Sequence, residues 1–193
     1  MGSEMCIRDS LGRMSPEKNP QNSILTLIEL RKRGVNARLV YVGMGPMFAK
    51  LKQMAAGHPV TFLGYIVDRN KLAEIMASAD VSIAPGPIET FCLAALESLA
   101  SGTPVVASAT SAVGEFLMLD SKLPVGAIAD NKPESFADAI QKVLLLRNEN
   151  LDFSQSCHHQ AENYPWSSTL MMMLRLHGAG HEVTALRRNL KAA

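Results

Sequence analysis

Cysteine is scarce in this chain of 193 residues, and its three copies, Cys6, Cys92 and Cys157, are widely spaced. An odd and dispersed set of cysteines matches neither a disulfide framework nor a metal site built on paired cysteines. The chain also has no run of 18 consecutive apolar residues, and its start lacks the apolar core of a signal peptide. We therefore expect a cytoplasmic protein without a transmembrane segment.

An excess of charge of one sign is also absent, because 19 lysines and arginines nearly cancel 18 aspartates and glutamates, which leaves a formal charge of +1. Such a balance provides no general field that would attract nucleic acid, so we expect no nucleic-acid partner. Hydrophobic residues make up 47% of the chain, enough for a buried core. The length fits one domain and is too short for two of full size.

Short apolar runs alternate with longer helical patterns after about residue 35. The predicted strands are residues 38–42, 60–66, 81–84, 104–108 and 125–129. Helical spacing marks residues 21–33 and 71–78 and a helix through Glu97, which Gly102 and Pro104 end. This rhythm predicts an α/β fold, a parallel sheet with helices on both faces, followed by a helical C-terminal extension.

The two ends of the chain depart from this rhythm. We expect residues 1–11 to be a non-native or truncated leader, because Arg8, Asp9 and Ser10 occupy positions that a strand buried on both faces would fill with apolar residues. Residues 12–177 then form the domain. Residues 178–193 form a C-terminal tail whose end is basic.

Two cations lie five residues apart on a glycine turn, Arg13 and Lys18 in the segment GRMSPEKNP that starts at Gly12. Two positive side chains that converge on one loop suit a diphosphate, with lysine as a point charge and arginine as a fork that grips two oxygens. The alternative is an exposed loop with solvated charges.

A second segment, GPIETFCLAALE, starts at Gly86, where an apolar strand ends and a helix begins. Ligands of parallel α/β sheets bind outside the carboxyl ends of the strands, where helix N-terminal amides favour phosphate. Glu89 and Glu97 are eight residues apart, a rise of roughly 12 Å if the whole stretch is helical. One carboxylate could then serve groups near the phosphates and the other a group two turns along the helix, a reach that suits a nucleotide sugar, although the spacing alone also arises by chance.

Other candidate sites are weaker. Gly43 and Gly45 directly follow a strand, and we expect a tight turn there, with the lining of a ligand site as the alternative. His177 and His181 have the spacing of metal ligands on a helix, but two glycines lie between them and nothing completes the ligand set. We therefore predict no metal site.

Five segments, GRMSPEKNP, VYVGMGP, VTFLGYI, SADVSIAPGPIETFCLAALESLASGTPVVAS and AENYPW, occur in this order. Together they resemble the C-terminal, donor-binding domain of GT-B glycosyltransferases of family 4, and ETFCLAALESLASGTPVV most resembles GDP-mannose-dependent alpha-mannosyltransferases of actinobacterial type. The resemblance implies the Rossmann-like C-terminal half of a GT-B fold. It also implies a retaining transferase, with no cofactor and no metal, whose partners are a nucleotide-diphosphate sugar donor and a sugar or glycolipid acceptor. The acceptor would be held by a missing N-terminal domain, and a glycolipid acceptor keeps open a peripheral position at the inner face of the membrane.

The resemblance also assigns roles to residues. Arg13 and Lys18, on the turn that starts at Gly12, would hold the pyrophosphate, Glu89 the donor sugar and Glu97 the ribose. The backbone amides of Phe91, Cys92 and Leu93 would meet the distal phosphate, and Tyr65, Ile66 and Val67 would lie near the base. Cys92 stands where the family usually has glycine. Two alternatives stay open: a nucleotide-binding module without catalysis, and a sugar-nucleotide 2-epimerase of GT-B architecture.

Overall fold

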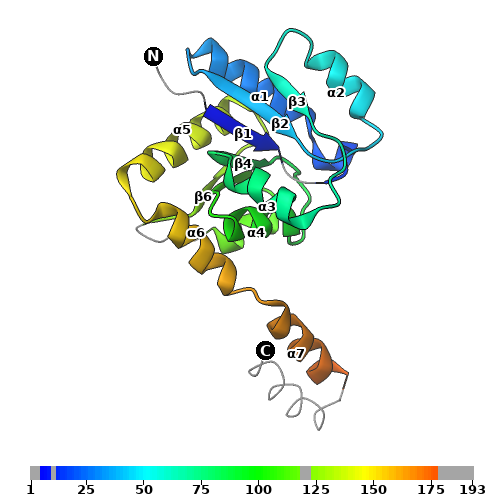
Figure 1. The fold of residues 1–193 in the computed structure, drawn as a ribbon, viewed down its shortest axis with the longest axis vertical. Helices are drawn as coiled ribbons and strands as arrows, with labels where there is room; N and C mark the ends of the chain where they lie inside the picture. The colour runs from blue at the N-terminus through cyan, green and yellow to red at the C-terminus, as the bar shows by residue number, and fades with distance from the viewer. Residues whose placement is uncertain (1–4, 10–11, 118–122, 178–193) are drawn as a thin grey trace.

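The computed structural model describes residues 5–9, 12–117 and 123–177, and within them one parallel sheet forms the centre of the molecule (Figure 1). Its strands are β1 (Met5–Asp9), β2 (Ala37–Tyr41), β3 (Val60–Phe62), β4 (Val81–Ala84), β5 (Val105–Ser108) and β6 (Gly126–Ala129). Their order across the sheet is β3-β2-β1-β4-β5-β6, and every neighbouring pair is parallel. This order is the Rossmann arrangement, with its reversal between β1 and β4.

Helices cover both faces of the sheet, which confirms the predicted α/β architecture. They are α1 (Gln21–Lys32), α2 (Phe48–Met54), α3 (Arg69–Ala77), α4 (Leu93–Ala100), α5 (Pro133–Glu149), α6 (Phe153–Glu162) and α7 (Trp166–Leu176), with short 3-10 helices η1 (Pro16–Lys18) and η2 (Ala112–Phe116). Helix α1 packs against α5, whereas α4 packs against both α3 and α6. All residues of β4 and β5 are buried, as the continuous apolar runs in the sequence predict.

The first strand lies within residues 1–11, the segment that we expect to be a leader. Residues 5–9 form β1, which pairs with β2 on one side and β4 on the other. Met5, Cys6 and Ile7 are buried, so three residues anchor the strand in the core. Its polar end does not prevent pairing, because the hydrogen bonds of a parallel ladder come from the backbone and not from the side chains.

The strand predicted at residues 60–66 is shorter in the structure, where β3 ends at Phe62. The chain then leaves the sheet through Gly64, whose carbonyl oxygen accepts a hydrogen bond from the Gly43 N–H at 2.7 Å. The apolar residues that follow, Tyr65 to Val67, therefore lie on a loop at the carboxyl edge of the sheet and not in a strand.

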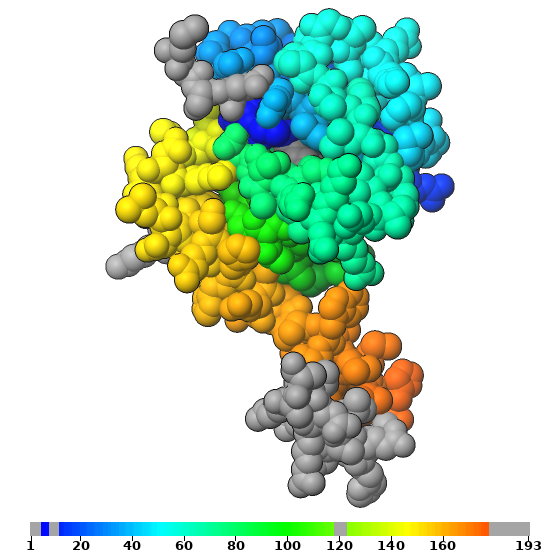
Figure 2. Space-filling view, viewed as in Figure 1, coloured from blue at the N-terminus to red at the C-terminus, as the bar shows by residue number. Residues whose placement is uncertain are grey.

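The predicted helical extension is present as α6 and α7. Helix α6 packs on α4, and its Gln160 donates from Nε2 to the Phe116 carbonyl at 2.8 Å. Helix α7 has no buried residue and projects from the body of the molecule (Figure 2). Within the described ranges, none of the helices is both long and apolar enough to cross a bilayer. The predicted tail, 178–193, lies outside the described residues.

Asp80 secures the amino end of β1. Its Oδ2 accepts the Cys6 N–H at 2.8 Å, and Arg147 on α5 donates to the Asp80 carbonyl at 2.6 Å. Removing this carboxylate leaves a backbone donor of the central strand without its acceptor. Asp80→Ala should therefore lower the free energy of unfolding by about 1 to 3 kcal/mol in urea titrations, whereas Asp80→Asn, which keeps an acceptor oxygen, should lose less. Equal losses in both variants would contradict this role of the hydrogen bond.

Candidate functional site

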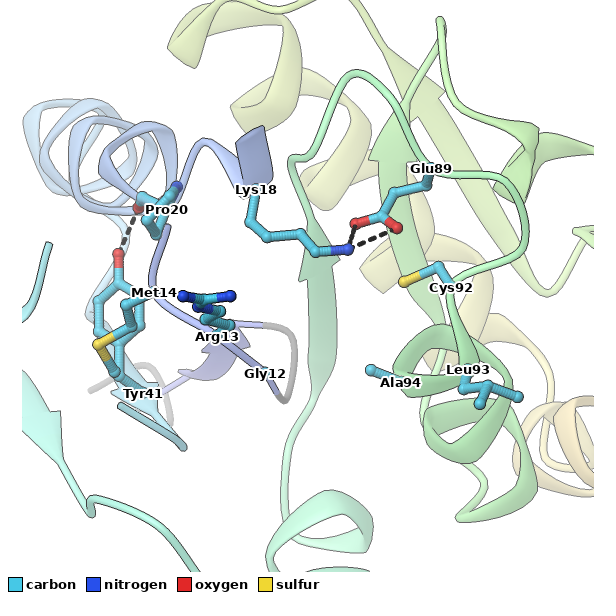
Figure 3. Close-up of a pocket in the computed structure, with 10 residues that line it drawn as sticks. All are labelled: Gly12, Arg13, Met14, Lys18, Pro20, Tyr41, Glu89, Cys92, Leu93 and Ala94. Atoms are coloured by element: carbon cyan, nitrogen blue, oxygen red, sulfur yellow. Dashed lines mark hydrogen bonds and ion pairs between the residues drawn. The ribbon is translucent and has the colours of Figure 1, made fainter. Parts of the chain in front are cut away.

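Two loops meet at the edge of the sheet where the strand order reverses. One follows β1 and carries Arg13 and Lys18; the other follows β4 and carries Glu89 and Cys92. Between them lies a cavity of about 210 Å³ (Figure 3). Its lining residues are Gly12, Arg13, Met14, Lys18, Pro20, Tyr41, Glu89, Cys92, Leu93 and Ala94. Ligands of doubly wound sheets bind in this crevice, outside the carboxyl ends of the strands.

The loop after β1 is held by the loop after β2. The Met14 N–H donates to the Met44 carbonyl at 3.1 Å, and the Met47 N–H donates to the Met14 carbonyl at 2.9 Å. Glycine is needed for this contact, because a Cβ at Gly45 would lie 2.5 Å from the Met14 backbone and one at Gly43 would lie 2.2 Å from the Gly12 oxygen. The two glycines thus form the predicted turn, and Gly43 also lines a second cavity described below.

The loop after β4 is held by the segment that follows β5. Thr110 Oγ1 donates to the Pro87 carbonyl at 2.8 Å, and the Ala112 N–H donates to the Glu89 carbonyl at 2.9 Å. Helix α4 begins only at Leu93, so Glu89 lies on the loop and Glu97 on the helix. The two carboxylates therefore do not share one continuous helix, and the 12 Å estimate does not apply.

Cys92 is the residue before α4 and has a left-handed backbone, with φ 63° and ψ 77°. Few residues with a side chain adopt this conformation, which glycine adopts without steric cost. The side chain of Cys92 points into the cavity, close to Glu89 (Figure 3). Leu93 and Ala94 border the same cavity, so the first turn of α4 contributes to its wall.

Lys18 and Glu89 face each other across the cavity. Lys18 Nζ lies 2.7 Å from Glu89 Oε1 and 2.8 Å from Oε2, so both carboxylate oxygens accept from one ammonium group (Figure 3). Arg13 is exposed and borders the same cavity, on the same loop as Lys18 (Figure 3). Glu17 is not part of this pair: its Oε1 accepts from Ser15 Oγ at 2.5 Å, and that hydrogen bond is the main reason its pKa is lowered.

A second cavity of about 490 Å³ adjoins the first, and Gly12 and Arg13 line both. The other residues of its wall are Val42, Gly43, Met44, Tyr65, Ile66, Val67, Arg69, Leu72 and Glu97. Tyr65 and Val67 are 78% and 80% exposed, which leaves apolar surface open in the cavity that Glu97 also lines. The structure thus gathers the predicted base and ribose residues in one place.

Arg69 and Leu72, which the sequence did not single out, lie in the second cavity because Asp68 starts α3 there: Asp68 Oδ1 accepts the N–H groups of Asn70 and Lys71 at 2.9 and 3.3 Å. An aspartate four residues before the first residue of an apolar helix face, Leu72, is a signal that could have found them. Phe91 lines neither of the two cavities.

The Phe91 ring lies in an aromatic cluster and not in either cavity. Its centroid is 5.5 Å from that of the Phe116 ring and 5.9 Å from that of the Tyr164 ring. Its predicted contribution, a backbone amide, does not depend on where the ring lies. No group of three His, Cys, Asp or Glu side chains able to hold a metal occurs among the residues that the structure describes, which include His177 but not His181.

The family model described as glycosyl transferases group 1 matches residues 9–160. The chain is 45% identical over 168 residues to a GDP-mannose-dependent alpha-(1-6)-phosphatidylinositol dimannoside mannosyltransferase of Mycobacterium tuberculosis, an alignment that covers 87% of this chain and 42% of that protein. It is 30% identical to a D-inositol 3-phosphate glycosyltransferase of Mycobacteroides abscessus, over 87% of this chain and 38% of that protein. The chain therefore spans less than half the length of these relatives.

Solved structures show the same fold. A sucrose-phosphate synthase of Thermosynechococcus elongatus superposes with a TM-score of 0.72 at 24% identity, over 99% of this chain and 47% of that one. The catalytic domain of a cholesterol-alpha-glucosyltransferase of Helicobacter pylori gives a TM-score of 0.70 at 22% identity, over 84% of this chain and all of that one. The six-stranded Rossmann-like sheet matches GT-B glycosyltransferase structures. Because the family model spans residues 9–160 and the mycobacterial relative is 45% identical, this chain belongs to the group 1 family of glycosyl transferases.

Proposed function

We propose that this domain binds a nucleotide-diphosphate sugar and serves as the donor-binding part of a retaining hexosyltransferase. The observation that carries the proposal is the pair of adjoining cavities at the strand-order reversal, which share Gly12 and Arg13. The smaller cavity is lined by Arg13, Lys18, the Glu89 carboxylate and the first turn of α4. The larger cavity is mostly apolar, and its charged groups are Arg13, Arg69 and the Glu97 carboxylate. The nucleoside diphosphate of a nucleotide sugar offers matching groups, an anionic diphosphate for the cations and a flat base on a ribose for the apolar wall and a carboxylate.

In this proposal the diphosphate lies in the smaller cavity. Arg13 grips its oxygens as a fork, and Lys18 contributes a point charge. The first turn of α4 adds N–H groups that lack partners within the helix. The base lies in the larger cavity against Tyr65 to Val67, and Glu97 accepts hydrogen bonds from the ribose hydroxyls.

GDP-mannose is the proposed donor, since the mycobacterial relative at 45% identity is named as GDP-mannose-dependent. The proposed reaction is transfer of mannose with retention of configuration. No protein nucleophile is needed if the departing diphosphate helps to deprotonate the acceptor, and Arg13, Lys18 and the α4 amides then stabilise the charge of the leaving group. A sugar or glycolipid acceptor would be held by a domain outside these 193 residues. The named activities of the relatives favour transfer over the 2-epimerase.

Arg13 gives the first test. Arg13→Ala removes a charge-assisted contact to phosphate, so calorimetric binding of GDP should weaken by about 1.5 to 3 kcal/mol, or roughly ten- to 150-fold in Kd. Lys50→Ala is the matched control, because Lys50 is an exposed cation on α2 that lines neither cavity. Equal affinity in wild type and Arg13→Ala would rule out Arg13 as a phosphate ligand.

Glu97 gives the second test. A carboxylate that accepts from both ribose hydroxyls should make 2′-deoxy-GDP bind about tenfold more weakly than GDP. Glu97→Gln should reduce this preference, whereas Glu74→Gln, which removes an exposed carboxylate from α3, should preserve it. A preference that is the same in all three proteins would mean that Glu97 does not contact the ribose.

Cys92 gives a third test that needs no substitution in the site. Cys6 and Cys157 are buried, and burial raises the pKa of Cys157 to about 12, so neither should react with N-ethylmaleimide at pH 7.5. Cys92 lines the smaller cavity and should react first, and saturating GDP should slow its alkylation at least fivefold, followed by peptide mass spectrometry. Guanosine, which lacks phosphate, should protect less. Alkylation at an unchanged rate with GDP bound would place the diphosphate elsewhere.

A further inference from the structure

The Lys18–Glu89 pair occupies the place where the proposed diphosphate binds. Both carboxylate oxygens lie within 2.8 Å of Lys18 Nζ, and both residues line the smaller cavity. The ammonium group therefore already has an anionic partner in the structure. An incoming phosphate must compete with Glu89 for Lys18.

The two partners differ in their freedom to move. The Glu89 side chain is only 10% exposed, and its backbone carbonyl is held by the Ala112 N–H. The Lys18 side chain is 39% exposed and ends a flexible four-carbon stem. When an anion enters the cavity, Lys18 is thus the partner that turns toward it, and Glu89 stays behind as an uncompensated negative charge.

The remaining charge affects different ligands differently. Free GDP ends in an unesterified phosphate, whose second ionisation, with a pKa of about 6 as for other terminal phosphates, adds a negative charge at pH 7.5. In a nucleotide sugar that oxygen is esterified, so this charge is absent. The sugar also brings hydroxyl groups, which can donate hydrogen bonds to a carboxylate, an acceptor with no proton of its own.

We propose that Glu89 is an internal competitor for Lys18, through which the domain prefers a nucleotide sugar to the free nucleoside diphosphate. This inference rests on the proposed function, because it needs the diphosphate to bind in this cavity. Glu89 weakens GDP binding in two ways. It keeps Lys18 in an ion pair, and its negative charge repels the terminal phosphate. The sugar of the donor replaces Lys18 as the partner of the carboxylate. Glu89 thereby favours release of the nucleotide product.

The test compares Kd values for GDP and GDP-mannose in wild type and Glu89→Gln, which keeps the shape of the side chain and removes its charge. GDP should bind roughly tenfold more tightly to Glu89→Gln, since Lys18 is freed. GDP-mannose should change less than threefold, because the gain at Lys18 is offset by the weakened contact to the sugar. The ratio of the two Kd values is the readout, since a general disturbance of the cavity would shift both alike.

Two further variants isolate the pair. Glu17→Gln removes a carboxylate from the residue next to Lys18, outside the cavity lining, and should leave the ratio unchanged. In a Lys18→Met background, Glu89→Gln should tighten GDP binding less than threefold, because no cation is left to release and only the repulsion of the terminal phosphate is relieved. Thermal unfolding of each variant checks that the fold is intact.

The outcomes separate this inference from the proposed function. If wild type binds neither GDP nor GDP-mannose, the proposed function fails and the inference fails with it. If wild type binds both ligands but Glu89→Gln leaves their Kd ratio unchanged, Glu89 is no competitor and the proposed function stands. A full tenfold effect of Glu89→Gln in the Lys18→Met background would also overturn the inference, because the effect would then not pass through Lys18.

Discussion

The reversal of strand order at β1 determines where everything else in this molecule lies. Strand β1 has β2 on one side and β4 on the other, so the strands that follow β1 and those that follow β4 are added at opposite edges of the sheet. The loops after β1 and β4 therefore diverge and leave a crevice between them. Both cavities open at this point and share its first residues, Gly12 and Arg13. The strand order therefore determines where the site lies, and the side chains determine what it can bind.

The loops on either side of the reversal are positioned by other loops. The segment after β2 supports the segment after β1 through backbone hydrogen bonds at Met14, and residues after β5 support the segment after β4 through Thr110 and Ala112. Backbone support of this kind leaves the side chains of Arg13, Lys18 and Glu89 available for the cavity. It also explains the placement of glycine at positions 43 and 45, where two backbones approach too closely for a Cβ.

Much of this arrangement is predictable from the sequence, and the remainder is not, for physical reasons. Buried strands such as Val81–Ala84 show themselves as continuous apolar runs, so the parallel sheet and its helices follow from local pattern. Strand β1 could not be predicted, because a short strand at the centre of a sheet is stabilised by pairing on both sides. Its partner strands are distant in sequence, so local composition does not reveal them. The same holds for the Lys18–Glu89 contact, since its partners are 71 residues apart. The left-handed backbone of Cys92 is contrary to the ordinary preference of cysteine, so it could be inferred only from the glycine that the family resemblance implies at this position.

The pairing of β1 with β4 also affects the order in which the protein can fold. Ile7 lies beside Val81, and parallel neighbours cannot be joined by a local hairpin, so the loop closure must enclose α1, β2, α2, β3 and α3. Closing so long a loop reduces the conformational entropy of the chain before the strands gain any favourable pairing, and this slows folding. During synthesis, β1 leaves the ribosome long before its second partner exists. The crevice therefore cannot form until β4 has been added, so it is not a local element that the rest of the chain joins.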